Sequence, residues 1–229
     1  MIGKNGTSMW MGKEKRLKER EPVKKEIHVN LEFLKNLRLI CVPVVLILYA
    51  PLNASALLQH PDRKQVEQAL NRGKEAARQH RLPNELYWHF GSTKQFEPHG
   101  FLVTKVSALA VMSGHFALRG EQPTDQDIQR ILGENALQVV VTVYGNSPGF
   151  ARDSYLLLKQ GERVVKPARI RFDARALSVG QRQGPPVFRA KIVGLFSYGT
   201  FDLEASATLL AFPGTGGEIR FDLDFSTIL

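Results

Sequence analysis

The residues of this chain that could carry chemistry gather around one aromatic stretch, Tyr87-Trp88-His89-Phe90, and a second histidine, His99. Two imidazoles can act as general acid and base or bind a metal ion, and neighbouring rings can form one wall of a ligand pocket. The alternative is a short buried strand that pins a loop to the core. We take Tyr87, Trp88, His89 and His99 as the candidate ligand-binding residues.

The sequence lacks the short motifs that identify common hydrolases. It has no Gly-x-Ser-x-Gly and no His-Glu-x-x-His, which position a nucleophile and zinc ligands respectively. The single cysteine, Cys41, lies inside an apolar run. We therefore expect no catalytic residue, no metal and no cofactor, and favour a non-enzymatic binding or envelope-structural module. The alternative is a hydrolase-type enzyme whose site is assembled near the loop between Tyr87 and His99.

Two further patterns have a structural as well as a chemical explanation. Asp222 and Asp224 are two residues apart in an alternating stretch, so they share a strand face about 7 Å apart and could hold calcium. Pairing with cations on neighbouring strands is the simpler explanation; the cations considered are Arg169, Arg171, Arg189 and Lys191. A phosphate-binding loop at Gly214-Thr215-Gly216-Gly217 would need a following helix. A strand pattern follows instead, so we expect a hairpin turn.

Hydrophobic spacing predicts three helices in the first part of the folded region. Residues 61–80 carry a thin apolar stripe, which predicts a helix that lies on the body of the protein or frays from it, and residues 105–118 form a second helix. Thr124 and Asp127 approximate a capping box at the start of a third, which Gly133 ends. From Leu137 onward the apolar pattern changes from helical to alternating.

Alternating and β-branched segments predict an antiparallel sandwich after this change. The expected strands are 137–144, 155–159, 163–166, 169–174, 188–196, 207–212 and 218–225. The expected fold class is α+β, with a short helical N-terminal part packed on an antiparallel β-sandwich, for which an immunoglobulin-like form is one option. The expected divisions are a basic segment with a signal peptide at 1–56, a helical prelude at 57–136 and the sandwich at 137–229. Residues 57–229 are expected to form one globular unit.

An uninterrupted apolar run at residues 39–50 follows a basic segment. Twelve helical residues span about 18 Å, short of the roughly 30 Å hydrocarbon core, and Ala54-Ser55-Ala56 fits the small-x-small cleavage pattern. We predict a signal peptide cleaved after Ala56. The alternatives are an uncleaved anchor over residues 39–58, which would make the chain a periplasm-facing subunit of an inner-membrane complex, and a buried core helix.

The net charge of +9 is concentrated near the N-terminus. Residues 1–38 hold ten Lys or Arg and five Glu, so residues 39–229 carry only +4. That value gives no electrostatic reason to expect a nucleic acid. We expect an exported bacterial protein, periplasmic or secreted, whose partner is a protein or another envelope component. Membrane contact is expected only through the N-terminal apolar segment, if that segment is retained.

Overall fold

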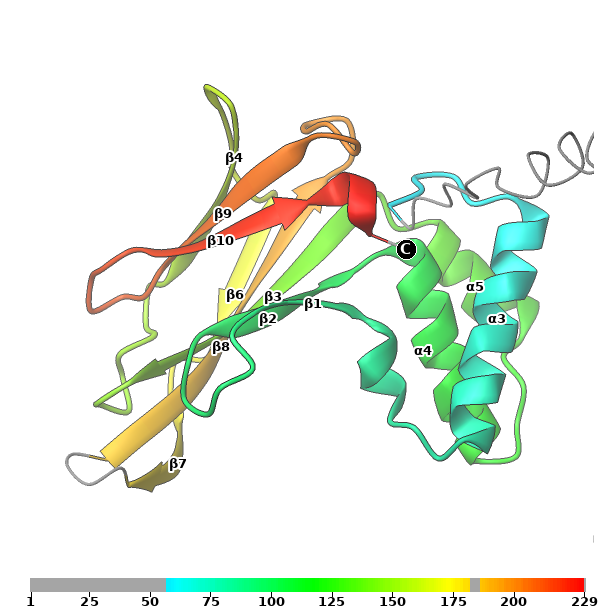
Figure 1. Ribbon diagram of the computed structural model, residues 1–229, viewed down its shortest axis with the longest axis horizontal. Coiled ribbons are helices and arrows are strands. Elements are labelled where there is room, and N and C mark those ends of the chain that lie inside the picture. Colours follow the sequence, from blue (N-terminus) through cyan, green and yellow to red (C-terminus); the bar gives the residue numbers. More distant parts are fainter. Residues whose placement is uncertain (1–56, 182–185, 229) are drawn as a thin grey trace, which may run out of the picture. The chain divides into compact units, whose positions relative to one another are not determined.

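The computed structural model describes residues 57–181 and 186–228, which belong to one compact unit. The predicted signal peptide, with Ala54 and Ala56, and the basic segment before it lie outside the described residues. The described part contains three α-helices and ten strands in two antiparallel sheets (Figure 1). The α+β fold class is therefore confirmed.

The three helices lie where the apolar spacing predicts them. They are α3 (Arg63–Arg78), α4 (Lys105–Leu118) and α5 (Asp125–Leu132), with short 3-10 turns η1 (Pro83–Leu86) and η2 (Phe225–Thr227) elsewhere. Each helix begins with a capping box, and the N-cap residues are Asp62, Thr104 and Thr124. A capping box satisfies two backbone N–H groups at a helix start. No helix in the described ranges is both long and apolar enough to cross a bilayer.

Helix α3 packs closely on α4, so it lies on the body of the protein, as one of the two expectations had it, and does not fray from it. Its buried residues are all small: Ala69, Gly73, Ala76 and Ala77. A Cβ atom on Gly73 would lie 2.0 Å from the carbonyl oxygen of Ala110. The Ser113 hydroxyl, on α4, donates to the Leu70 carbonyl at 2.7 Å. The small side chains of this apolar stripe allow the backbones of α3 and α4 to approach each other closely.

Helix α5 buries none of its own residues. Instead, the Lys105 ammonium at the start of α4 donates to the carbonyl of Leu132, the last residue of α5, at 2.6 Å. Lys105 is only 6% exposed, and this burial lowers the pKa of its amine, while Glu134 acts in the opposite direction. A cation at the C-terminal carbonyls of a helix is favourable, so Lys105 links α5 to α4.

Sheet A has six strands in the order β1-β2-β3-β8-β6, with β7 also paired to β8. Their bounds are β1 (Trp88–Gly91), β2 (His99–Val103), β3 (Ala136–Gly145), β6 (Arg169–Phe172), β7 (Leu177–Gln181) and β8 (Pro186–Ser197). Sheet B has the order β10-β9-β4-β5. Its strands are β4 (Tyr155–Gln160), β5 (Arg163–Val165), β9 (Ser206–Phe212) and β10 (Ile219–Asp224).

The first two strands of sheet A lie inside the expected helical prelude. β1 is the short strand considered for the aromatic stretch, and β2 pairs with β3, so the sheet begins well before residue 137. β7 has a register shift between Ser178 and Gly180, which breaks its alternation. The expected turn at 213–217 does join β9 to β10. The strand order does not by itself establish an immunoglobulin-like topology.

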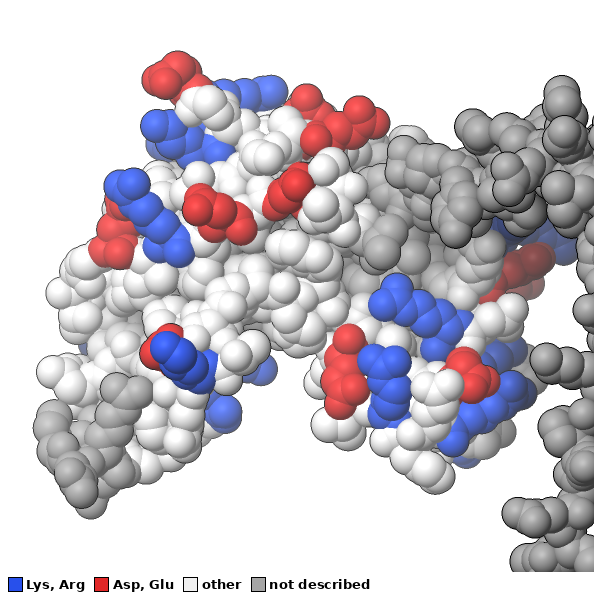
Figure 2. Space-filling model, viewed as in Figure 1, with Lys and Arg blue, Asp and Glu red and all other residues white. Residues whose placement is uncertain are grey.

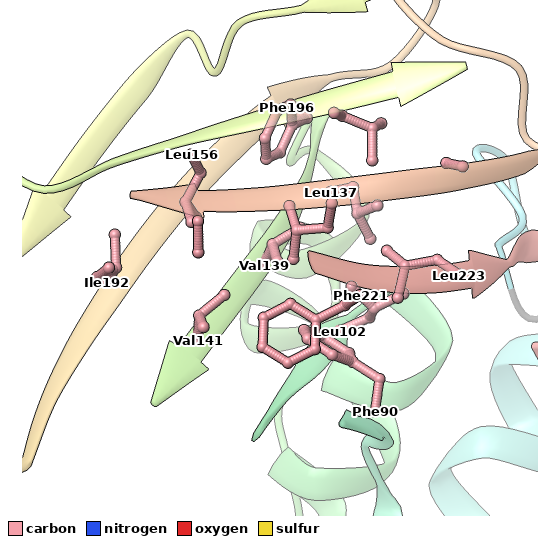
Figure 3. Close-up of a cluster of buried hydrophobic side chains, with 14 of the residues drawn as sticks. Phe90, Leu102, Leu137, Val139, Val141, Leu156, Ile192, Phe196, Phe221 and Leu223 are labelled. Atoms are coloured by element: carbon pink, nitrogen blue, oxygen red, sulfur yellow. The ribbon is translucent and has the colours of Figure 1, made fainter. Parts of the chain in front are cut away.

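The main core lies between the two sheets (Figure 3). Sheet A contributes Leu102, Leu137, Val139, Val141, Ile192 and Phe196, and sheet B contributes Leu156, Phe221 and Leu223. Phe90 meets Phe221 edge to face, with ring centroids 5.0 Å apart. Because side chains alternate along a strand, the remaining residues of sheet A form an outer face that points away from sheet B.

Candidate functional site

Alternation along β1 divides the candidate residues between two faces. Trp88 packs against the core, whereas His89 is paired with Phe101 on the outer face. Tyr87 stacks on the Phe101 ring, with centroids 4.8 Å apart, and burial raises the pKa of its phenol. His99 is on the outer face too. The structure therefore brings Tyr87, His89 and His99 to one face and places Trp88 on the other.

A surface pocket of about 660 Å³ lies on this outer face and contains both histidines. Its strand residues come from β1, β2, β3, β7 and β8, and the loop between β1 and β2 supplies the rest. The lining includes His89, His99, Tyr144, Val179, Arg189, Lys94 and Phe96. We call it the loop-covered pocket. Tyr87 and Trp88 do not line it.

Contacts within the loop hold it in place. The Ser92 hydroxyl donates to the Glu97 carboxylate at 2.5 Å and accepts from the Lys94 N–H at 3.1 Å. Phe96 has φ +63°, an uncommon backbone conformation for a bulky residue, which the surrounding structure must hold. The centroid of the Phe96 ring lies 5.9 Å from the centroid of the Tyr144 ring, and the two rings meet edge to face. The loop thus adds an aromatic wall to the pocket.

The two histidines each bond to a backbone carbonyl. His89 Nε2 lies 3.1 Å from the Asn84 oxygen, and His99 Nδ1 lies 3.0 Å from the Glu97 oxygen. A carbonyl only accepts, so these nitrogens are the donors. This leaves Nδ1 of His89 and Nε2 of His99 for a ligand.

No acid–base pair or metal cluster is formed by these histidines in the described part of the chain. Neither imidazole is bonded there to a carboxylate or a hydroxyl. The described residues also contain no group of three or more His, Cys, Asp and Glu side chains placed to hold a metal ion. Each imidazole is held by one backbone carbonyl and lies beside an aromatic ring, His89 beside Phe101 and His99 beside Tyr144.

Apart from His89 and His99, the lining residues are not among the candidates taken from the sequence; Phe96, Tyr144 and Arg189 are three of them. Tyr144 and Arg189 are directly opposite each other in the pairing of β3 with β8. Alternation predicts that Arg189 points outward from its strand, but no local pattern predicts which residue it faces. Tyr144 and Arg189 meet through the register of β3 with β8, which alternation alone does not determine.

The pair Asp222 and Asp224 lies on the outer face of sheet B, at a second pocket of about 590 Å³. Asp222 accepts from the Thr208 hydroxyl at 3.2 Å, and Asp224 accepts from the Ser226 N–H at 3.1 Å. The expected pairing with the cations of β6 and β8 is wrong, because those strands belong to sheet A. Both carboxylates instead bond to a nearby hydroxyl or backbone group.

Another titratable pair lies apart from both pockets. The Tyr198 hydroxyl is buried without a hydrogen-bond partner in the described structure, and burial raises the pKa of Tyr198 to about 12. The Lys105 ammonium lies 5.9 Å from the Tyr198 ring centre. Lys105 bonds to the end of α5, and the raised pKa keeps the Tyr198 phenol protonated at neutral pH.

No protein-family model matches this chain, and no curated protein matches it either. Fold and site alone therefore define its class. It is an α+β protein of two packed antiparallel sheets with a ligand-sized pocket on the outer face of one of them.

Proposed function

We propose that this chain is an exported, non-enzymatic binding module that takes its ligand in the loop-covered pocket. The observation that carries the proposal is the convergence of five strands and one ordered loop on a single pocket of about 660 Å³. Small-molecule sites typically have volumes of about 300–1,000 Å³ and combine apolar rings with a few polar groups. The hydrolase alternative gains no support from the two histidines, which bond to backbone carbonyls.

The lining indicates the chemistry of the ligand. Phe96 and Tyr144 offer ring faces and edges, and His99 offers one free ring nitrogen. Arg189 is exposed and has no ion-pair partner among the described residues. Lys94, by contrast, has an ion-pair partner: its Nζ atom lies 4.0 Å from Oε1 of Glu97. A ligand with a ring and an anionic group placed near Arg189 fits this lining.

An aromatic sulfonate, 8-anilinonaphthalene-1-sulfonate, is a suitable probe of this pocket. We expect saturable fluorescence enhancement at one site, and Arg189→Gln should weaken binding about tenfold, because a charge-assisted hydrogen bond contributes about 1.5–3 kcal/mol. Phe96→Ala should also weaken it, through loss of the aromatic wall. The measurement is a fluorescence titration of the folded protein with each variant.

The matched control for the probe is Arg220→Gln, which removes an arginine from the second pocket on sheet B. This variant should bind the probe as the unchanged protein does. Equal weakening by Arg189→Gln and Arg220→Gln would contradict the proposed site.

Cleavage at the predicted site, after Ala56, would leave Leu57 in the mature chain. Leu57 is 1% exposed and belongs to the sandwich core. We expect the protein expressed from its own gene to begin near Leu57 and to be found in the periplasmic or secreted fraction. N-terminal sequencing and fractionation measure this. A chain that keeps residues 39–56 in the membrane fraction would contradict cleavage and favour the anchored alternative.

A further inference from the structure

Four cations form a stripe on the outer face of sheet A, next to the loop-covered pocket. Arg169 and Arg171 are on β6, opposite Leu195 and Val193 of β8, and Arg189 and Lys191 are on β8 itself. Arg189 and Lys191 occupy two successive outward positions of β8, and Arg171 and Arg169 lie level with the next two, one strand over on β6. Such positions are about 7 Å apart, so the stripe is about 20 Å long. We call it the basic stripe.

The basic stripe is positively charged along its length. All four side chains are on exposed residues, and none has an ion-pair partner within the described ranges. The adjacent carboxylate is Asp173, which accepts from the Lys191 N–H at 2.9 Å. In contrast, acidic and basic side chains are mixed on the face seen in Figure 2, over sheet B. The charged residues at the second pocket, on sheet B, also have both signs: Asp222, Asp224, Arg220 and Lys159, with Glu218 paired to Arg220.

Protection of an exposed sheet edge accounts for the two cations on β6, but not for the two on β8. β6 is an edge strand, and charged side chains there discourage pairing with another chain. β8 is not an edge, because β3 pairs along one side and β6 and β7 along the other. Arg189 and Lys191 thus need another explanation.

We propose that the basic stripe docks an extended acidic segment of a partner protein, which runs along β8 and ends in the loop-covered pocket. The inference rests on the proposed function, since Arg189 belongs to both features. An extended polypeptide presents every second side chain on one face at the same repeat of about 7 Å. Alternate Asp or Glu residues therefore meet the four cations in register. Half-buried Val193 and Leu195, beside the stripe, offer apolar contact to the segment.

The test compares two labelled peptides of the same composition. One alternates glutamate and threonine four times, and the other has four glutamates followed by four threonines. In fluorescence anisotropy with the full chain, the alternating peptide should bind at least fivefold more tightly. Lys191→Gln and Arg171→Gln should each weaken its binding about threefold, the effect of one exposed ion pair, and together about tenfold. Added salt should weaken it further.

The matched control is Arg163→Gln on β5, in sheet B, which should leave peptide binding unchanged. Equal affinity for the two peptides would overturn the proposal, as would stripe variants that bind like the unchanged protein. Tighter binding of polyphosphate or of anionic phospholipid vesicles would also overturn it, in favour of a general anion surface or a membrane.

The same variants separate this proposal from the pocket. Lys191 and Arg171 do not line the loop-covered pocket, so Lys191→Gln and Arg171→Gln should still bind the aromatic sulfonate. Register-specific peptide binding without sulfonate binding would overturn the proposed pocket and support the stripe. Sulfonate binding without register-specific peptide binding would overturn the stripe alone.

Discussion

Phe196→Ala is expected to lower the free energy of unfolding by about 3–5 kcal/mol, the usual range for a buried phenylalanine. Phe196 is 0% exposed and lies between the two sheets (Figure 3). Removing its ring loses apolar burial and leaves a cavity that both sheets must collapse to fill. Urea unfolding followed by circular dichroism measures the change.

The control for the core is Phe212→Ala. Phe212 is only partly buried, and it stacks on the exposed Tyr155 ring with centroids 4.4 Å apart. Its pairing is worth about 0.5–1.5 kcal/mol beyond area burial, so this variant should be clearly less damaging than Phe196→Ala. A loss of the same size for both would mean that Phe196 does not occupy the core between the sheets.

Gly73→Ala is expected to destabilise the protein by about 2 kcal/mol, within the range for overpacking. At an ordinary helix position the same change is stabilising by about 1 kcal/mol, because alanine has the higher helix propensity. Here the added Cβ would lie 2.0 Å from the Ala110 oxygen and 2.8 Å from the Gly114 nitrogen. Helix α3 must therefore move away from α4. Thermal unfolding gives both the sign and the size of the effect.

Gly149→Ala is the matched control, since a Cβ there meets nothing within 4 Å. Surface changes of this kind usually stay within about 0.5 kcal/mol. Stabilisation by Gly73→Ala would contradict the close contact of the two helices.

Local patterns predict most of the secondary structure correctly. The three helices follow from apolar spacing and from caps such as Thr124 with Asp127, whose bonds form within four residues. The strands after residue 137 follow from alternation, which reports the burial of each side chain. The α+β class is therefore predictable, and so is the outward position of Arg189 and Lys191. The expectation of export also comes from a local pattern, and it is still a prediction.

The candidate site is predicted only in part. Closeness in sequence is what makes Tyr87, Trp88, His89 and His99 candidates for one site. The pocket contains His89 and His99, but Trp88 turns toward the core because neighbours in a strand face opposite ways. Adjacency along β1 thus overstates the number of residues that can contact one ligand.

Long-range pairing decides the rest. Tyr144 meets Arg189 because β3 and β8 pair over ten residues, and a one-residue slip would turn every side chain of one strand to the other face. The pairing of β6 with β8 places Arg169 and Arg171 opposite Leu195 and Val193, next along the outer face from Lys191 and Arg189. Asp222 and Asp224 are separated from these arginines because they belong to the other sheet. Alternation specifies a face for each side chain, whereas only the packing of the whole core against both sheets selects its neighbours.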